Sequence, residues 1–549
     1  MILRRLYLYI VSAAALVLLA IGLTFLGTTV LLFVFNDPNA DSSRSQLAIF
    51  TAMTVVALPV WGVHFWFARR FAMRDPFERA SAIRRLYLYW ASFVSSIAAA
   101  EALQFTLGQA MAPFVDNQNV SNVITAQLGW ATLVFAAIFA FHFQVAARDR
   151  AAVGEEGGSA TLRRWYMYAA LFFGLLVMLT NSASILMLGL TSLANNAAGR
   201  SGGMSFAVAG ALSGALLWGF HARVIATRHI TQDRHSTLRA IEGFLAVAIS
   251  IGAALVGASQ ILYYGLARLL GVSHPGGTTG NLVADAAGPV SQVLVFGVAW
   301  FLLQRRITRD AVSQEADRQA GVRRLYTNLA SLVSLAAWAV GAGGLLWNLF
   351  EQIEAPIIGV TASDWKDPVS LWVTLLVVGL VVWIAHWRQS PWAADRQSLS
   401  RKLYVWAALL GSILAVLAGG VGMINALFQQ LFSAHPSLAS RSNLDFGHFL
   451  AVILVGAGVG VYHLRVLRAD AAARPARPAP VQPVVTRPVA VANEAAPAPA
   501  AAETLAPHSR RYSLVVSDAT DDDIHQALSS LPPHASYKLT PTETAVDGH

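Results

Sequence analysis

The sequence predicts an all-α membrane protein with twelve transmembrane helices, arranged as six parallel two-helix hairpin repeats. Two observations carry this prediction. Of the 549 residues, 56% are hydrophobic and only 13% are charged, which is too apolar for a set of soluble domains with charged surfaces. In addition, basic residues run into a long apolar stretch six times, at intervals of 75 to 85 residues. A fixed spacing of this kind is typical of a repeated structural unit.

Each repeat begins with basic residues that lead into the first apolar stretch, usually through an aromatic residue. The five clear copies are Arg4-Arg5-Leu6-Tyr7, Arg84-Arg85-Leu86-Tyr87, Arg163-Arg164-Trp165-Tyr166, Arg323-Arg324-Leu325-Tyr326 and Arg401-Lys402-Leu403-Tyr404. The fourth copy in chain order, at Arg239-Ala240-Ile241, lacks both the basic pair and the tyrosine. Arginines beside tyrosines favour a topology signal with an aromatic belt. The alternative is a set of sites for anionic lipid headgroups, at about 1 kcal/mol for each basic residue.

Each repeat contains two apolar stretches separated by a polar turn. About 20 apolar residues are enough to cross the hydrocarbon core of a bilayer. The first stretch, Leu6 to Phe35, is too long for the hydrophobic region of a signal peptide, so we expect an uncleaved membrane helix. The twelve expected spans are 6–35 and 47–67, 86–114 and 121–147, 165–193 and 203–222, 244–267 and 286–303, 325–350 and 368–387, and 403–432 and 446–464.

The repeats divide the chain into six hairpin units and a tail. We place the units at residues 1–80, 81–160, 161–232, 233–320 (the divergent copy), 321–398 and 399–468. Stacked hairpins are expected to form a ring or a bundle, with small residues such as those at 341–344 at the contacts. The Pro- and Ala-rich stretch 469–510 predicts a disordered or extended linker. It leads to a small cytoplasmic α/β-like segment, residues 511–549, with the pattern of two strands and one helix.

Basic residues indicate which side of the membrane each turn faces. Lys and Arg near helix ends are retained in the cytoplasm. The linkers between repeats are rich in arginine, for example Arg69, Arg70 and Arg74, whereas the turns inside hairpins carry few basic residues. We therefore expect a multi-pass protein of the cell membrane with both termini cytoplasmic.

A histidine recurs near the end of the second helix in five repeats, at His64, His142, His221, His386 and His463. These positions, with Gln304 in the fourth repeat, lie 57 to 65 residues after the second basic residue. Aligned histidines suit a ring of metal ligands or of pH-titrating groups. We favour inner-interface anchors, because the fourth copy lacks histidine and no carboxylate ligand recurs with the others. The basic residues and first tyrosines of the clear copies are predicted to belong to the same set of anchors.

Glu101 is the one acidic residue deep inside an apolar span, where a charge is costly, so it should face the bundle interior. Gln104 lies three residues on, and related positions in later repeats hold Asn181, Gln260, Asn348 and Asn425. These side chains predict an intramembrane polar seam. Such a seam is either a path for solutes or protons, or a set of hydrogen bonds between helices.

No catalytic or cofactor-binding constellation accompanies the repeats. The chain has no cysteine, which excludes disulfides and thiolate metal sites. An intramembrane enzyme needs acid, base or nucleophile groups at one depth, and we expect no catalytic, metal or cofactor site. The net charge of +9 comes mostly from arginines beside apolar stretches, which predicts membrane lipids with anionic headgroups as partners and no nucleic acid. The sequence does not determine an oligomeric state.

The Arg-Arg-Leu-Tyr start and a paired helix that ends in Trp-x-x-His, as in Trp61 to His64, resemble an uncharacterised prokaryotic membrane family. It is the domain of unknown function numbered fifty-six seventy-one. The resemblance covers residues 1 to about 468 and is weak in the fourth copy. It implies a polytopic bacterial membrane protein of uncharacterised activity and assigns no functional residue.

Three functional hypotheses follow. A non-enzymatic scaffold or lipid-interacting protein accounts best for the regular repeats and for the lack of charged pairs in the apolar core. A solute or proton-coupled transporter accounts for the size and the number of helices. A membrane sensor acting through residues 469–549 accounts for the tail, which would then bind a protein partner.

Overall fold

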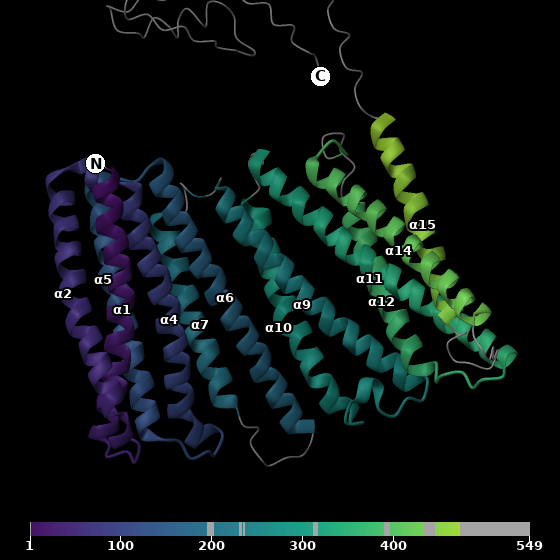
Figure 1. Cartoon of the computed structure of the whole chain (residues 1–549), viewed down its shortest axis with the longest axis horizontal. Coiled ribbons are helices and arrows are strands. Elements are labelled where there is room, and N and C mark those ends of the chain that lie inside the picture. The colour runs from purple at the N-terminus through teal and green to yellow at the C-terminus, as the bar shows by residue number, and fades with distance from the viewer. Residues whose placement is uncertain are drawn as a thin grey trace, which may run out of the picture. The chain divides into compact units, whose positions relative to one another are not determined.

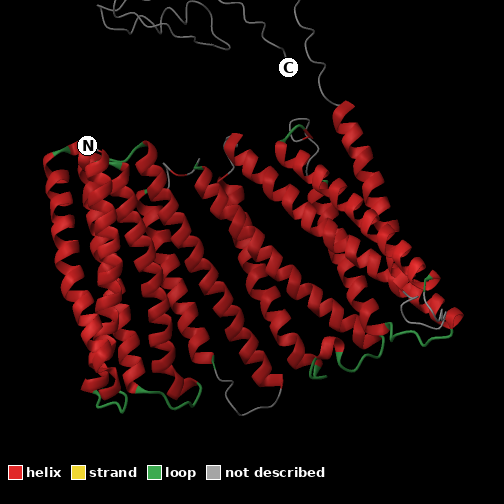
Figure 2. Cartoon of the chain, in the orientation of Figure 1, coloured by secondary structure: helices red, strands yellow, loops and turns green. Residues whose placement is uncertain are grey.

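A computed structural model of the chain describes residues 2–194, 203–229, 233, 236–310, 317–388, 396–432 and 445–472. In this part of the chain all the regular secondary structure is helical (Figure 2). Twelve of the described helices are long and apolar enough to cross a membrane, which confirms the expected number. The strands and the helix expected in the C-terminal segment lie outside the described residues.

The long helices follow one another in pairs along the chain. They are α1 (Ile2–Val34) and α2 (Arg44–Arg74), α4 (Ala82–Val115) and α5 (Asn122–Val153), α6 (Gly157–Ala194) and α7 (Met204–Arg228), α9 (Thr237–Leu269) and α10 (Leu282–Asp310), α11 (Asp317–Ile358) and α12 (Lys366–Trp387), and α14 (Leu399–Leu431) and α15 (Asp445–Ala472). The short helix α3 (Pro76–Arg79) connects the first two pairs, and single 3-10 turns lie at η1 (Asp41–Ser43) and η2 (Pro275–Gly277).

Most of these helices are longer than a bilayer requires. At 1.5 Å per residue, the 33 residues of α1 extend about 50 Å, whereas the hydrocarbon core is about 30 Å thick. A helix of this length has to tilt or protrude, so residues near its ends can leave the hydrocarbon. The basic residues that open each repeat lie in the first turns of such helices.

The two helices of each pair pack side by side and run antiparallel (Figure 1). Neighbouring pairs meet through the first helix of one pair and the second helix of the next, as α1 with α5, α4 with α7, α6 with α10, α9 with α12 and α11 with α15. The pairs thus form an open row, in which α2 and α15 lie at opposite ends (Figure 1). Among the described helices, each pair packs on its neighbours in the chain and the first and last pairs lie apart, so the arrangement is a stack of pairs and not a closed ring.

Two glycines show how close the two helices of a pair lie to each other. A Cβ atom at Gly214 of α7 would lie 2.5 Å from the backbone nitrogen of Met178 in α6, and one at Gly379 of α12 would lie 2.6 Å from that of Trp338 in α11. Any larger residue at either position would push the two backbones apart. Small residues therefore set the close contact inside these pairs.

The best-buried cluster of side chains lies where the basic residues enter the helices. It includes Tyr9, Tyr87, Tyr89, Tyr166 and Tyr168. Elsewhere, large apolar side chains such as Val55 and Leu133 are about two-thirds exposed, at 64% and 65%. Side chains exposed in this way can contact lipid. At the end where the basic residues lie, by contrast, side chains from several helices form a buried core.

Candidate functional site

Tyrosine and histidine pairs connect the two helices of five helix pairs. The tyrosine hydroxyl lies 3.2 Å from Nε2 of the histidine in Tyr7–His64, 3.1 Å in Tyr87–His142, 2.9 Å in Tyr166–His221, 3.4 Å in Tyr326–His386 and 2.9 Å in Tyr404–His463. Each tyrosine belongs to the start of a repeat and each histidine to the recurrent position near its end. The two periodic signals of the sequence are therefore partners of one another.

The second ring nitrogen of each histidine defines the direction of these bonds. Nδ1 faces the backbone carbonyl four residues earlier, for example that of Ile138 at 2.8 Å from His142 and that of Leu217 at 2.8 Å from His221. A carbonyl only accepts, so Nδ1 carries the proton, and in the neutral imidazole Nε2 then accepts from the tyrosine hydroxyl. The side chains of His142, His221 and His463 are at most 1% exposed. They face a protein partner and not a headgroup.

A tryptophan from the preceding helix pair completes two of these arrangements. The indole Nε1 of Trp61 in α2 donates to the Tyr87 hydroxyl at 2.9 Å, and that of Trp383 in α12 donates to the Tyr404 hydroxyl at 2.9 Å. Each tryptophan lies three residues before the histidine of its own repeat. The tyrosine oxygen thus accepts from one pair and donates within the next, so it joins consecutive pairs.

The basic residues that open the repeats form ion pairs with carboxylates at the end of the second helix of a pair, as Asp149 in α5 and Asp470 in α15, or just after it, as Glu78, Glu155 and Asp233. Arg5 lies 2.7 Å from Glu78, Arg84 2.7 Å from Asp149, Arg163 3.0 Å from Glu155 and 3.2 Å from Asp233, Arg164 2.8 Å from Asp233, and Arg401 2.7 Å from Asp470; Arg4 also pairs with Glu78. Arg84 and Arg85 are at most 1% exposed. Buried charges of this kind persist only when they are paired and hydrogen-bonded.

The second tyrosine of the first three repeats connects this ion-pair layer across the row. Arg84 donates from Nη1 to the Tyr9 hydroxyl at 2.9 Å, and the Tyr89 hydroxyl donates to Glu155 at 2.5 Å. The Tyr168 hydroxyl lies 3.3 Å from Asp233. We call these tyrosines, histidines, arginines and carboxylates together the polar layer. The buried arginines of this layer have protein carboxylates as partners, where we had expected interfacial anchoring.

Other predicted anchors are less buried. Tyr7 is 59% exposed, and Lys402 is exposed. Arg323 and Arg324 of α11 are half-buried, as is Tyr326. The interfacial anchor role stays a prediction for these residues.

Sequence reasoning missed the acidic members of the polar layer. A signal for them exists, because an acidic residue follows the first basic residue by 74 positions at Glu78, 65 at Asp149, 70 at Asp233 and 69 at Asp470. His229, which follows α7, was missed as well. Burial, together with the charges of Arg163 and Arg150, lowers the pKa of His229 to about 4, so this imidazole is neutral at pH 7.

Among the described residues, no hydrogen bond joins the members of the expected polar seam, which stays a prediction. Glu101 and Gln104 are half-buried on α4, and Asn181 is half-buried on α6, where it donates to the Val177 carbonyl at 2.8 Å. Asn348 is buried on α11 and donates to the Gly344 carbonyl at 3.1 Å. Gln260 and Asn425 are exposed, and Gln260 lines a cavity between α9, α11 and α12. The side-chain hydrogen bonds of Asn181 and Asn348 thus go to the preceding turn of their own helix.

In the described ranges, no group of three or more His, Asp or Glu side chains is placed to hold a metal ion. The recurrent histidines lie on separate helices, and each directs Nε2 at a tyrosine. The remaining candidates for binding sites are the cavities between helix pairs.

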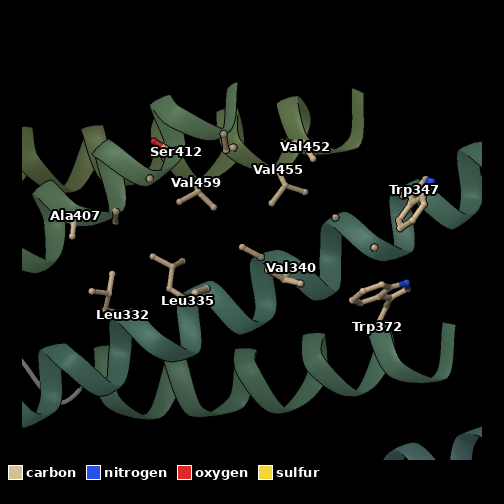
Figure 3. Close-up of a pocket in the computed structure, with 18 of the residues that line it drawn as sticks. Leu332, Leu335, Val340, Trp347, Trp372, Ala407, Ser412, Val452, Val455 and Val459 are labelled. Carbon is tan, nitrogen blue, oxygen red and sulfur yellow. The ribbon is translucent and has the colours of Figure 1, made fainter. Parts of the chain in front are cut away.

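One cavity of about 460 Å³ lies between α11, α12, α14 and α15; we call it the α11–α15 cavity. Figure 3 shows Leu332, Leu335 and Val340 of α11 on one side of it and Val455 and Val459 of α15 on the other, with Trp347 and Trp372 at one end. A second cavity of about 540 Å³, the α9–α12 cavity, lies between α9, α11 and α12. Both are lined mainly by aliphatic and small side chains.

Long apolar helices in pairs, joined at one end by a polar layer, define a multi-pass α-helical membrane protein. The family model described as Domain of unknown function (DUF5671) matches residues 5–132, 99–195 and 324–458, and the chain belongs to this family. The internal stretch without a match, residues 196–323, contains α7 and the pair α9 and α10, in which Ile241 and Gln304 take the places of the tyrosine and the histidine. No curated protein and no solved structure matches the chain.

Proposed function

We propose that the protein is a non-enzymatic, lipid-interacting scaffold of the cell membrane, which holds lipid chains between its helix pairs. The observation that carries this proposal is the pair of apolar cavities between consecutive helix pairs. Their volumes lie within the range of about 300–1,000 Å³ that is usual for small-molecule sites. A polar solute would lose its hydrogen bonds to water there without replacement, whereas a lipid chain would not.

The polar layer supports a structural role. Its members bond mostly to one another, as Arg84 does to Asp149 and Tyr87 to His142. A catalytic or transport site needs polar groups that remain available to a substrate. Interactions that join consecutive helix pairs, such as the bond from Trp61 to Tyr87, instead suit a scaffold.

We further propose six parallel hairpin repeats with both termini cytoplasmic. Arg69, Arg70 and Arg74, in the last turns of α2, are exposed and lie at the same end as the polar layer. Arginines so placed stay on the cytoplasmic side and attract anionic headgroups. On this topology the tail beyond residue 468 is cytoplasmic, where a protein partner can bind it.

Filling one cavity tests the lipid-binding proposal. Gly411 of α14 lines the α11–α15 cavity, and a Cβ atom there would meet no other atom within 4 Å, so Gly411→Leu fills the cavity without a backbone clash. Gly420 on the same helix is equally open and does not line the cavity, so Gly420→Leu is the matched control.

The measurement is cross-linking of a phospholipid with a photoreactive acyl chain to the purified protein in nanodiscs, mapped by mass spectrometry. We expect labelling of α11 and α14 at the cavity in the parent and in Gly420→Leu, and loss of most of it in Gly411→Leu. Equal labelling of the three proteins would contradict the proposal.

A further inference from the structure

The fourth helix pair departs from the pattern of the others. Where the other pairs have a tyrosine and a histidine, α9 has Ile241 and α10 has Gln304. The α9–α12 cavity, the larger of the two described above, lies where this pair meets the next one. The divergence of the fourth repeat thus coincides with open space between α9, α11 and α12.

A polar group borders one end of this apolar cavity. Tyr326 of α11 and His386 of α12 both line it, and their bond of 3.4 Å is the longest of the five tyrosine–histidine bonds. Nδ1 of His386 faces the Val382 carbonyl at 2.9 Å, so Nε2 is the acceptor and the Tyr326 hydroxyl is the donor. The lone pairs of the tyrosine oxygen remain as acceptors.

In two of the four other tyrosine–histidine pairs that acceptor position is filled by a tryptophan N–H, whereas Tyr166, like Tyr326, has a phenylalanine (Phe139) at the corresponding place in the preceding repeat. Tyr87 accepts from Trp61, and Tyr404 accepts from Trp383, each tryptophan lying three residues before the histidine position of the preceding repeat. The same position before Gln304 is Phe301, which has no side-chain donor. Among the described residues, none is recorded as donating to the Tyr326 oxygen. Tyr326 lines the cavity, so an N–H or O–H group bound there can donate to its oxygen.

The length and lining of the rest of the cavity suit an extended hydrocarbon chain. Its lining on α9 runs from Ala248 to Gln260, which is 12 residues or about 18 Å at 1.5 Å per residue. Between the two ends the lining is mostly aliphatic, with Leu255, Leu329 and Val333, and it includes Ser259 and Ser334. Tyr326 and His386 lie at one end, the mostly aliphatic wall extends away from them, and Gln260 lies at the far end of the lining on α9. A polar head beside Tyr326 and an apolar chain along the wall correspond to a single-chain amphiphile.

We propose that the α9–α12 cavity binds a single-chain membrane amphiphile whose head carries a hydroxyl group. The hydroxyl donates to the Tyr326 oxygen, in the place that a tryptophan N–H takes at Tyr87 and Tyr404, and the chain lies along α9, α11 and α12. This site rests on the proposed lipid-binding function and adds a headgroup preference to it. An alkane of equal length can make the same contacts with the aliphatic side chains, but it has no hydroxyl group to donate to the Tyr326 oxygen.

The test compares two probes on the full-length protein in nanodiscs, a photoreactive hexadecanol and a photoreactive hexadecane. We expect the alcohol to label the α9–α12 cavity, with competition by unlabelled hexadecanol at concentrations about three to ten times lower than by hexadecane, as one hydrogen bond implies. Tyr326→Phe should remove the difference between the two competitors while the protein keeps its melting temperature within a few degrees.

A cavity-filling variant keeps the test decisive if Tyr326→Phe unfolds the protein. Gly252 of α9 lines the cavity and a Cβ atom there would meet nothing within 4 Å, so Gly252→Leu should abolish labelling by the alcohol. Gly265, also on α9 and equally open, does not line the cavity, and Gly265→Leu should keep the labelling.

Equal competition by hexadecane and hexadecanol in the parent would overturn the headgroup preference and leave the lipid-binding function intact. Labelling that persists in Gly252→Leu would show that the site lies elsewhere. Absence of labelling by either probe, here and in the α11–α15 cavity, would overturn the proposed function itself.

Discussion

The hydroxyl of Tyr87 lies 3.1 Å from Nε2 of His142, and both side chains are at most 4% exposed. Because Trp61 donates to the same hydroxyl at 2.9 Å, one phenol connects α2, α4 and α5. A hydrogen-bonded group at a helix–helix contact fixes how deep each helix lies and how it is rotated about its axis. Contacts between aliphatic side chains alone fix these two quantities less strictly.

The first prediction concerns this tyrosine. Tyr87→Phe removes the hydroxyl and leaves both the Trp61 N–H and the His142 Nε2 without a partner in a buried site, so we expect a destabilisation of about 2–3 kcal/mol. The measurement is thermal unfolding in detergent micelles. Tyr7→Phe is the control, because Tyr7 is 59% exposed and water can replace its hydroxyl. A similar melting temperature for the two variants would contradict the structural role of the pair.

The second prediction concerns the buried ion pair of Arg84 and Asp149, whose side chains are 1% and 6% exposed. Arg84→Met leaves the Asp149 carboxylate with Arg79 as its remaining arginine, and breaking a buried pair costs about 3–5 kcal/mol. Arg44→Met is the control, because the Arg44–Asp41 pair is 74% and 83% exposed and contributes less than about 1 kcal/mol. Unfolding of both variants under the same conditions gives the comparison, and equal losses would contradict burial of the polar layer.

The third prediction concerns Asp116, which follows α4 and caps the start of α7. Its carboxylate accepts from the backbone nitrogens of Gly203 at 3.2 Å, Met204 at 3.1 Å and Ser205 at 3.1 Å, and from the Ser205 hydroxyl at 2.6 Å. Burial alone would raise the pKa of Asp116, but these hydrogen bonds outweigh it and hold the pKa below its usual value. We expect Asp116→Ala to cost about 1–2 kcal/mol at pH 7.

The pH dependence follows from the direction of that shift. Since the folded-state pKa is below the unfolded value of about 3.9, the contribution of the ionised Asp116 is fully present above that value. It is lost as the pH falls through the folded-state pKa. The difference in melting temperature between the parent and Asp116→Ala should therefore be constant from pH 7 to 5 and shrink in stronger acid. A difference that grows on acidification would refute the assignment.

The fourth prediction is the membrane topology. Reporter fusions at Asp75 and Arg396, which belong to linkers between helix pairs, should give a cytoplasmic signal, because basic linkers are retained there. A fusion at Pro38, in the turn between α1 and α2, should give an extracytoplasmic signal. The opposite result at any of the three positions would contradict six hairpins with a common orientation.

The fifth prediction separates a scaffold from a transporter. Glu101 is half-buried on α4, and we expect vesicles that contain the parent protein to show no proton or cation flux above empty vesicles. Glu101→Gln should then alter only the thermal stability. A flux in the parent that is abolished by Glu101→Gln at unchanged expression would favour the transporter instead.

The sequence by itself determined the membrane helices and the period of the repeats. Hydrocarbon demands a minimum length and a low charge from every span, and these are properties of each stretch on its own. The same reasoning found the recurring tyrosines and histidines and the divergence of the fourth repeat at Ile241 and Gln304. It assigned the two kinds of residue to one surface of the membrane, but it did not show that Tyr87 bonds to His142 or Tyr404 to His463.

Those partnerships were decided only by the tertiary structure. Whether Arg84 meets Asp149, 65 residues away, depends on the relative depth and rotation of two helices. Depth and rotation result from many packing contacts at once, including close approaches such as that at Gly214, and no single stretch of sequence contains them. The α9–α12 cavity has the same origin, because the space beside Tyr326 exists only where three helices of two neighbouring pairs fail to fill it.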